Sequence, residues 1–257
     1  MTIADPVRVE PIHGGACWMV VLGGSKGNIL DAASMDALRR VFDRAAGDPH
    51  LKAICLTGDG AHFSYGASVP EHLPDRVEGM LRRFHDLVGT MIACSVATLA
   101  AVRGQCLGGA LEIVTCCHRV FASPDARLGQ PEIVLGVFAP VASVVLPDRI
   151  GRGRAEDLCL TGRTVDATDA LGMGLVDEVV DDPVAAASAY IETHLLPKSA
   201  SSLRLAVKAL RGGLRARLER ELPSVERVYL DELMRTGDAV EGLQAFVERR
   251  RPLWRDR

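Results

Sequence analysis

The sequence predicts an α/β fold, and two observations support this prediction. Short apolar runs of strand length alternate with segments that carry the 3.6-residue periodicity of amphipathic helices. From about residue 184 this alternation stops, and helical patterns alone continue to the end. A chain of 257 residues is long enough to bury a sizeable core. We therefore expect a core domain over residues 1–195 and a helical region over residues 196–257.

The first elements follow from local pattern. Three uncharged or nearly uncharged runs have strand length: ACWMVVL at 16–22, LKAICLTG at 51–58 and VATLAAV at 96–102. Between the first two, SMDALRRVFDRAAG at 34–47 has helical spacing of its apolar residues, and a second helix is expected over 75–93.

A long loop precedes the second helix. Its sequence, GDGAHFSYGASVPEHLPD, is rich in glycine and proline, and compact domains seldom keep such loops without a function. Within it, SVPE matches a capping box in which Ser68 is the N-cap and Glu71 reaches back to it. A helix is therefore expected to begin after Ala67.

Composition excludes several classes of function. The net charge of −3 and the lack of a basic, aromatic-interleaved patch argue against nucleic-acid binding. The N-terminus shows no secretory signal, and the longest uncharged run, 133–146, is too short to span a bilayer. Seven cysteines without a C-x-x-C pair are typical of reduced thiols, so we expect a cytoplasmic protein that contacts no membrane. The scattered histidines predict no metal site.

The stretch GQCLGGALE, residues 104–112, predicts an anion-binding site. The chain turns at Gly104 and begins a helix near Gly108, which leaves the N–H groups around Gly109 without partners inside the helix. Glycine lets a ligand oxygen approach the backbone, and the helix dipole favours negative charge there. Glu112 lies one turn further along the same helix.

A second acid, Glu132, stands in the apolar segment LGQPEIVLG. Burial and a neighbouring carboxylate both raise a carboxyl pKa, so two such glutamates indicate acid–base chemistry. The alternative is structural: Glu112 would pair with Arg103 or Arg119, and Glu132 with Arg127 or Arg149. Three histidines are expected to be structural or surface residues, and two serines lack the context of a nucleophile; they are His62, His85, His118, Ser64 and Ser68.

Four segments, in order and spacing, resemble the crotonase, or enoyl-CoA hydratase/isomerase, superfamily. They are LKAICLTGDGAHFSYGAS, AAVRGQCLGGALEIVTCCHRVFASPDARLGQPEIVLGV, GRGRAEDLCLTGRTVDATDALGMGLVDEVV and EGLQAFVERRR. The resemblance implies a ClpP/crotonase-like spiral of ββα units and a C-terminal helical region that packs subunits into trimers, often hexamers.

The resemblance also implies roles for particular residues. The N–H groups of Ala67 and Gly109 match those that hold the thioester oxygen of an acyl-CoA. Glu112 and Glu132 match the two acids of hydratases, with Glu112 mainly holding water and Glu132 donating the proton, whereas isomerases typically keep one acid. CoA is part of the substrate, so no separate cofactor is implied. Phe246 and Arg249 match contacts to a neighbouring subunit's CoA, and Lys26 is expected near its phosphates.

Two departures from the family pattern concern the acyl site. Ser68 replaces the usual aspartate, and VFAPVASVVLPDRIG replaces a glycine-rich stretch, which predicts that residues 141–144 reshape an apolar acyl site. FSYGASVPEHLP and GQPEIVLGVFAP are most similar to the cyclohexa-1,5-diene-1-carbonyl-CoA hydratases of anaerobic aromatic degradation. Such an enzyme hydrates a conjugated cyclic dienoyl-CoA. The alternatives are a straight-chain enoyl-CoA hydratase, a dienoyl-CoA isomerase, and a non-catalytic acyl-CoA-binding protein of this fold.

Overall fold

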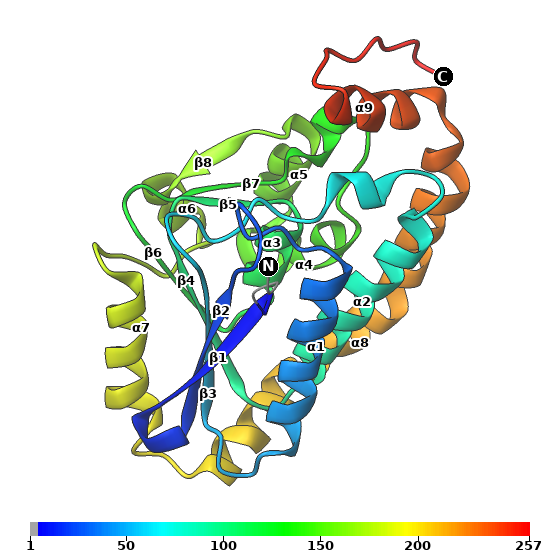
Figure 1. Ribbon diagram of the computed structural model, residues 1–257. Helices are drawn as coiled ribbons and strands as arrows, with labels where there is room; N and C mark the ends of the chain where they lie inside the picture. The colour runs from blue at the N-terminus through cyan, green and yellow to red at the C-terminus, as the bar shows by residue number, and fades with distance from the viewer. Residues whose placement is uncertain (1–4) are drawn as a thin grey trace.

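A computed structural model describes residues 5–257. The expectation of no signal peptide, and the expected start of the core, rest partly on residues 1–4, which lie outside that range. The larger sheet has the strand order β1-β2-β3-β4-β6-β9 (Figure 1), and its strands are β1 (Val7–Ile12), β2 (Cys17–Leu22), β3 (Ala53–Gly58), β4 (Ala97–Val102), β6 (Arg119–Ala122) and β9 (Glu178–Val179). All its neighbouring strands run parallel except the antiparallel pair β1–β2.

The three predicted strands form the centre of this sheet. Every residue of β2 and β4 is buried, which is the pattern of parallel strands covered on both faces. In register, Val20 lies opposite Leu56, and Leu56 lies opposite Ala100. These three side chains join the core beneath α1 (Ala32–Gly47) and α2 (Val77–Ala93), whereas the alternate residues face α7 (Pro183–Tyr190) across the sheet (Figure 1).

Both predicted N-terminal helices are confirmed to within two residues at each end. Asp31 caps α1, with its Oδ1 accepting from Ser34 N at 2.9 Å. The capping box at Ser68, however, is wrong. Ser68 does precede a short 3₁₀ helix, η2 (Val69–His72), but its own N–H donates to Leu30 O at 3.1 Å. With that donor used, the Glu71 carboxylate accepts instead from Ala32 N at 3.3 Å, and so caps α1.

A smaller sheet follows the turn at Gly104. It consists of β5 (Gln105–Leu107), β7 (Arg127–Gly129) and β8 (Thr164–Asp166), with β5 and β7 parallel. The short helix α3 (Gly109–Thr115) begins where β5 ends, with Gly108 as its N-cap, as the sequence predicts. The remaining helices of the core are η3 (Pro131–Leu135), α4 (Pro140–Ile150), α5 (Arg152–Thr161) and α6 (Ala167–Met173).

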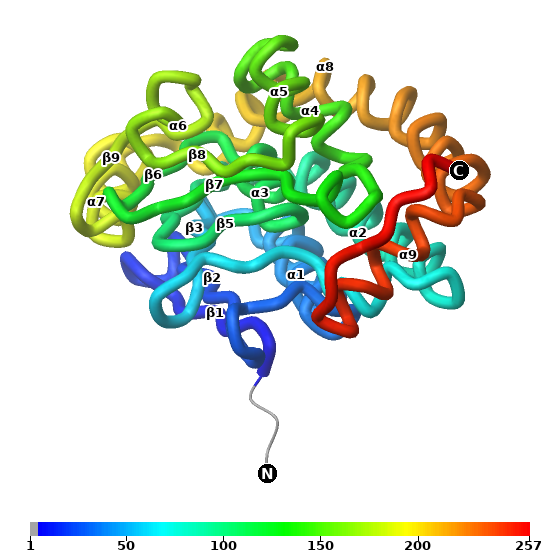
Figure 2. Tube along the Cα trace, turned by 90° about the horizontal axis from the view of Figure 1, so that it is seen from above, coloured from blue at the N-terminus to red at the C-terminus, as the bar shows by residue number. Residues whose placement is uncertain are grey.

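The C-terminal region is helical, as predicted. It contains α8 (Ala200–Arg227), η5 (Val228–Glu232), η6 (Leu233–Arg235) and α9 (Gly237–Val247). Two short helical stretches lie before it in the chain, the 3₁₀ helix η1 (His13–Gly15) and the π-helix η4 (Ile191–Leu195). Helix α8 packs along α2 and α4, and its buried Leu218 and Leu222 join the main core. The residues after α9 run back over that helix (Figure 2), so that Asp238 N donates to Arg257 O at 3.2 Å.

Candidate active site

Two backbone N–H groups lie side by side where the 58–75 loop passes the start of α3. Gly66 has a φ of 90°, and a Cβ atom on it would lie 3.3 Å from Gly109 N. A Cβ on Gly109 would in turn lie 3.4 Å from Ala67 N. No acceptor for the N–H of Ala67 or Gly109 is found among residues 5–257. Two adjacent free N–H groups at a helix start can hold an oxygen that carries negative charge.

The loop that carries Ala67 is fixed by buried polar residues. Ser64 is fully buried; its Oγ donates to Asn28 O at 2.7 Å and accepts from Gly66 N at 3.0 Å. The Asn28 side chain donates to three carbonyls of the same loop, including Phe63 O at 3.1 Å. Sequence reasoning missed Asn28, because its role depends on contacts with carbonyls that are 31 to 35 residues away along the chain.

Glu112 is buried on α3 and bound by the start of α4. Its Oε1 accepts from Ala142 N at 2.7 Å, in the first turn of α4, where a carboxylate also meets the positive end of the helix dipole. Burial raises the pKa of Glu112 to about 7, and the N–H groups of Ala142 and Val141 work against that rise. The group is thus poised between its two protonation states near neutral pH.

Glu132 lies in η3 and faces α3. The residue as a whole is partly accessible, but its Oε2 atom is buried and has no hydrogen-bond partner among the described residues. Burial, and then the nearby charge of Glu112, raise its pKa to about 8. The two carboxyls influence each other's protonation, and burial of both favours a shared proton at the pair.

All four predicted catalytic positions wall one small cavity. Its volume is about 20 Å³, which is the space of one water molecule. The two N–H groups and the two carboxyls share this wall with a mostly apolar set: His72, Met80, Leu81, Phe84, Phe138, Ala139, Pro140 and Tyr229. Sequence reasoning found the four polar positions but missed Tyr229, which comes from η5.

The structural alternative for the two glutamates is wrong. No ion pair to either carboxyl is found in residues 5–257, because the four arginines have other partners. Those contacts are Arg103 with Asp182 at 2.5 Å, Arg119 with Glu178 at 3.0 Å, Arg149 with Asp177 at 2.6 Å, and Arg127 with Ala126 O at 2.9 Å. Two buried carboxyls without a cation are expensive for a fold to keep, which favours a chemical role.

The three histidines are structural, as predicted. His62 Nδ1 accepts from Gln105 N at 3.2 Å, and His118 Nδ1 accepts from Thr98 N at 3.0 Å. His85 contacts Glu226 at 2.5 Å, on the face between α2 and α8. None of the three lines the cavity between the glutamates.

Residues 141–144, which were predicted to reshape the acyl site, do not line the cavity between the two glutamates. Pro140 begins α4, and the first helical turn exposes Ser143. Ser143 and Val144 therefore line a separate hollow of about 810 Å³ beside α8. The residues that close the cavity from this segment are Phe138, Ala139 and Pro140. Of the predicted wall, Ala142 contributes its backbone N–H to Glu112.

The expected CoA contacts lie outside this cavity. Phe246 is 53% exposed at the end of α9 and lines, with Arg249 and Pro70, a hollow of about 560 Å³. This hollow adjoins η2, which directly follows Ala67 and Ser68. Lys26 is exposed on a loop that contacts the middle of the 58–75 loop, two residues before Ala67, where Tyr65 N donates to Gly27 O at 2.9 Å.

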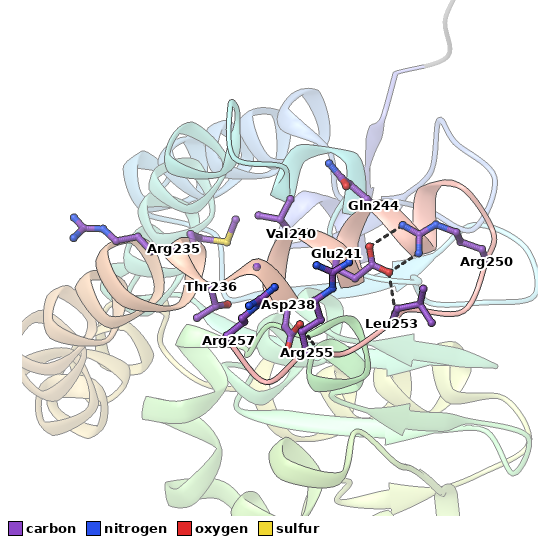
Figure 3. Close-up of a pocket in the computed structure, with 12 residues that line it drawn as sticks. Arg235, Thr236, Asp238, Val240, Glu241, Gln244, Arg250, Leu253, Arg255 and Arg257 are labelled. Atoms are coloured by element: carbon purple, nitrogen blue, oxygen red, sulfur yellow. Dashed lines mark hydrogen bonds and ion pairs between the residues drawn. The ribbon is translucent and has the colours of Figure 1, made fainter.

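The C-terminal segment packs against η3, the short helix that carries Glu132. A Cβ on Gly242 of α9 would collide with Leu135 O, and the Trp254 ring packs against Gly136 at the end of η3. Glu241 holds the segment in place, because it pairs with Arg250 and accepts from Leu253 N at 2.8 Å (Figure 3). Asp238 accepts from Arg255 N at 2.8 Å in the same way.

Residues 5–257 include all seven cysteines of the chain. All seven cysteines are free, and six of them are buried, which fits the predicted reduced thiols. In this part of the chain no cluster of three or more histidine, cysteine or acidic residues could bind a metal, and no helix is both long and apolar enough to cross a bilayer.

Comparisons with known proteins find relatives that match almost the whole chain. The chain is 45% identical over 254 residues to a cyclohexa-1,5-dienecarbonyl-CoA hydratase of Thauera aromatica, covering 99% of this chain and 98% of that one. It is 35% identical over 230 residues to a probable enoyl-CoA hydratase of Mycobacterium bovis, covering 88% of each. The crystal structure of an enoyl-CoA hydratase from Mycobacterium avium subsp. paratuberculosis superimposes with a TM-score of 0.85 at 25% identity, over 98% of this chain and 99% of that one.

These matches confirm the predicted crotonase fold and the prediction of an enzyme of the hydro-lyase class. The family model for enoyl-CoA hydratase/isomerase matches residues 17–257, which include both glutamates and both N–H groups. The chain belongs to the enoyl-CoA hydratase/isomerase family.

Proposed function

We propose that the protein adds water to cyclohexa-1,5-diene-1-carbonyl-CoA and forms 6-hydroxycyclohex-1-ene-1-carbonyl-CoA in anaerobic aromatic degradation. Hydration is supported above all by the arrangement of the cavity. Two buried carboxyls with raised pKa and no neighbouring cation surround the space of one water molecule, and two free N–H groups lie beside it. The choice of a cyclic substrate is supported by the 45% identity to the Thauera aromatica hydratase.

The first step uses the two N–H groups. The thioester oxygen accepts hydrogen bonds from Ala67 N and Gly109 N, which draws electrons from the conjugated ring. Glu112 accepts a proton from water, and the water oxygen bonds to the β-carbon. The product of this step is a dienolate, whose negative charge lies largely on the oxygen that the two N–H groups hold.

The second step uses the other acid. Glu132, which matches the proton-donating acid of the family's hydratases and whose pKa is raised by burial, gives its proton to the γ-carbon of the dienolate, and the electron pair of the enolate returns to the carbonyl. The net change is 1,4-addition of water. One proton then passes from Glu112 to Glu132 to restore the starting state, an exchange between two groups that already share a proton.

The alternatives are less well supported. An isomerase of this family typically needs one acid, whereas this cavity has two. A non-catalytic acyl-CoA-binding protein has no use for two buried carboxyls without a cation, which are unfavourable in the folded state. A straight-chain enoyl-CoA hydratase uses the same groups, and the cyclic substrate is favoured over it by 45% identity to the Thauera aromatica hydratase against 35% to the probable enoyl-CoA hydratase of Mycobacterium bovis.

The proposal extends to binding and assembly. Lys26, Phe246 and Arg249 contact CoA, the latter two across a subunit boundary, in a homotrimer or a dimer of trimers located in the cytoplasm. The exposed position of Phe246, which lines an open hollow with Arg249, supports their access to a neighbouring subunit's CoA.

Product analysis tests the proposed function. The purified protein is incubated separately with cyclohexa-1,5-diene-1-carbonyl-CoA and with crotonyl-CoA, and the thioesters are identified by mass. We expect the cyclic diene to gain the mass of one water, with a Glu132→Gln variant as the inactive control. Conversion of crotonyl-CoA alone would leave a straight-chain hydratase, and no hydration of either would leave a binding protein.

A further inference from the structure

Besides Glu132 Oε2, the wall of the active-site cavity contains a second buried polar atom without a hydrogen-bond partner among residues 5–257, the hydroxyl oxygen of Tyr229. Its side chain is 1% exposed, and it lines the same small cavity as Glu112 and Glu132. Its hydroxyl is buried and has no hydrogen-bond partner among residues 5–257. Buried hydroxyls without partners are rare in folded proteins, because they lose their bonds to water and gain none in return.

The backbone at Tyr229 is also unusual. The residue lies in η5, a π-helical stretch that continues α8 without a break. Such stretches are rare and occur frequently at functional sites, since the extra residue in the turn changes the direction of the side chains that follow. The ring itself is held by Phe138, edge to face, at a centroid distance of 5.1 Å.

The cavity accommodates one water, and a buried water takes two to four polar partners. Two buried polar atoms of the wall have no other partner among the described residues: Glu132 Oε2 and Tyr229 Oη. Building on the hydration proposed above, we propose that Tyr229 is a third catalytic group, whose hydroxyl oxygen accepts a hydrogen bond from the reacting water.

In this role Tyr229 neither gains nor loses a proton. One O–H bond of the water breaks toward Glu112 as the oxygen bonds to the β-carbon. The other O–H persists as the hydroxyl of the product and is the one that Tyr229 orients. Burial, followed by the charges of Glu132 and Glu112, raises the pKa of Tyr229, so the phenol stays neutral through the reaction.

A Tyr229→Phe variant removes the hydroxyl and keeps the ring that packs on Phe138. We expect kcat to fall roughly 10- to 100-fold, the loss of one hydrogen bond in the transition state, with KM within about twofold and thermal stability unchanged. The matched control is Tyr190→Phe, because Tyr190 packs on Phe121 behind the sheet and does not line the cavity. We expect this control to match the unaltered protein.

Isotope exchange distinguishes a role of Tyr229 in holding the water from a general disturbance of the active site by the substitution. In D₂O the enzyme, supplied with its hydroxy-thioester product, exchanges hydrogen at the carbon that Glu132 protonates and also eliminates water. Breaking that C–H bond needs Glu132 and the two N–H groups, whereas breaking the C–O bond also needs the groups around the hydroxyl. Tyr229→Phe should therefore raise the ratio of exchange to dehydration, and Glu132→Gln should lose both.

Two results would overturn the proposal: turnover of Tyr229→Phe within twofold of the Tyr190→Phe control, or equal loss of exchange and dehydration. The experiment uses whichever thioester the unaltered protein hydrates faster. Faster hydration of crotonyl-CoA would refute the cyclic substrate. The ratio of exchange to dehydration, measured with crotonyl-CoA's hydration product, would then still decide the role of Tyr229. Absence of hydration with either thioester would overturn both proposals.

Discussion

The carboxyl of Glu132 lies against the backbone of Gly108, with Oε1 2.5 Å from the position that a Cβ atom on Gly108 would occupy. Gly108 also has a φ of 55° and a ψ of −129°, which side chains other than hydrogen rarely permit. The glycine pair therefore has two functions. Gly108 leaves room for one acid, and Gly109 places its N–H beside that of Ala67.

Replacing Gly108 tests this relationship. In Gly108→Ala the added methyl group collides with the Glu132 carboxyl and strains the backbone, so we expect kcat to fall roughly 100-fold through misplacement of the acid. The control is Gly213→Ala on α8, where the added methyl meets nothing within 4 Å, and which should keep full activity. Steady-state kinetics of the two variants decide the point, and normal turnover by Gly108→Ala would show that the close contact is unimportant.

The second prediction concerns Glu132 itself. Glu132→Gln keeps the shape of the side chain and removes the transferable proton, so kcat should fall by at least ~10²-fold while binding of CoA esters is largely retained. Glu156→Gln, an exposed residue of α5, is the control. Calorimetric titration with the product thioester separates binding from turnover. A folded Glu132→Gln variant with near-normal kcat would remove Glu132 from the mechanism.

The third prediction uses the raised pKa of Glu132. In the unfolded chain this carboxyl ionises near pH 4.5, whereas in the folded protein it keeps its proton up to about pH 8. Between these values the folded state binds more protons than the unfolded state, so this group's contribution to stability falls as pH rises. Glu132→Gln lacks the effect. Its midpoint of thermal unfolding, relative to the unaltered protein, should therefore rise from pH 5 to pH 8, and a pH-independent difference would contradict the burial of this acid.

The fourth prediction concerns the C-terminal segment. Truncation after residue 235 removes α9, with its fully buried Leu243, and the Trp254 ring that packs on Gly136. We expect the shortened chain to assemble less, to bind CoA more weakly and to lose turnover, because η3 and Glu132 lose their support. Light scattering, product binding and kinetics measure the three effects. An unchanged oligomer would show that α9 does not serve assembly.

Local pattern was enough to predict the central strands and the first two helices, because continuous apolar runs and helical periodicity are properties of short segments. The strands β5 to β9 were not predicted, since each has only two to four residues. The capping box failed for a different reason. The partner of Glu71 is Ala32, thirty-nine residues away, and no local motif reports such a contact.

The residues of the active site likewise include some that local sequence could predict and some that it could not. The glycine pair and the two acids stand in recognisable stretches, and so they were found. Whether arginines neutralise those acids is decided by tertiary contacts such as Arg103 with Asp182, which the sequence left open. Tyr229 had no signal at all, since its place in the cavity depends on how α8 and η5 pack against the core.

We propose that this hydratase acts on a cyclic dienoyl thioester. The most direct test of this proposal is the ratio of kcat/KM for cyclohexa-1,5-diene-1-carbonyl-CoA to that for crotonyl-CoA, measured on the same preparation. We predict a ratio of at least ~10², which corresponds to about 2.7 kcal/mol of differential transition-state binding. A ratio of one or less would contradict the assignment and leave a general enoyl-CoA hydratase in its place.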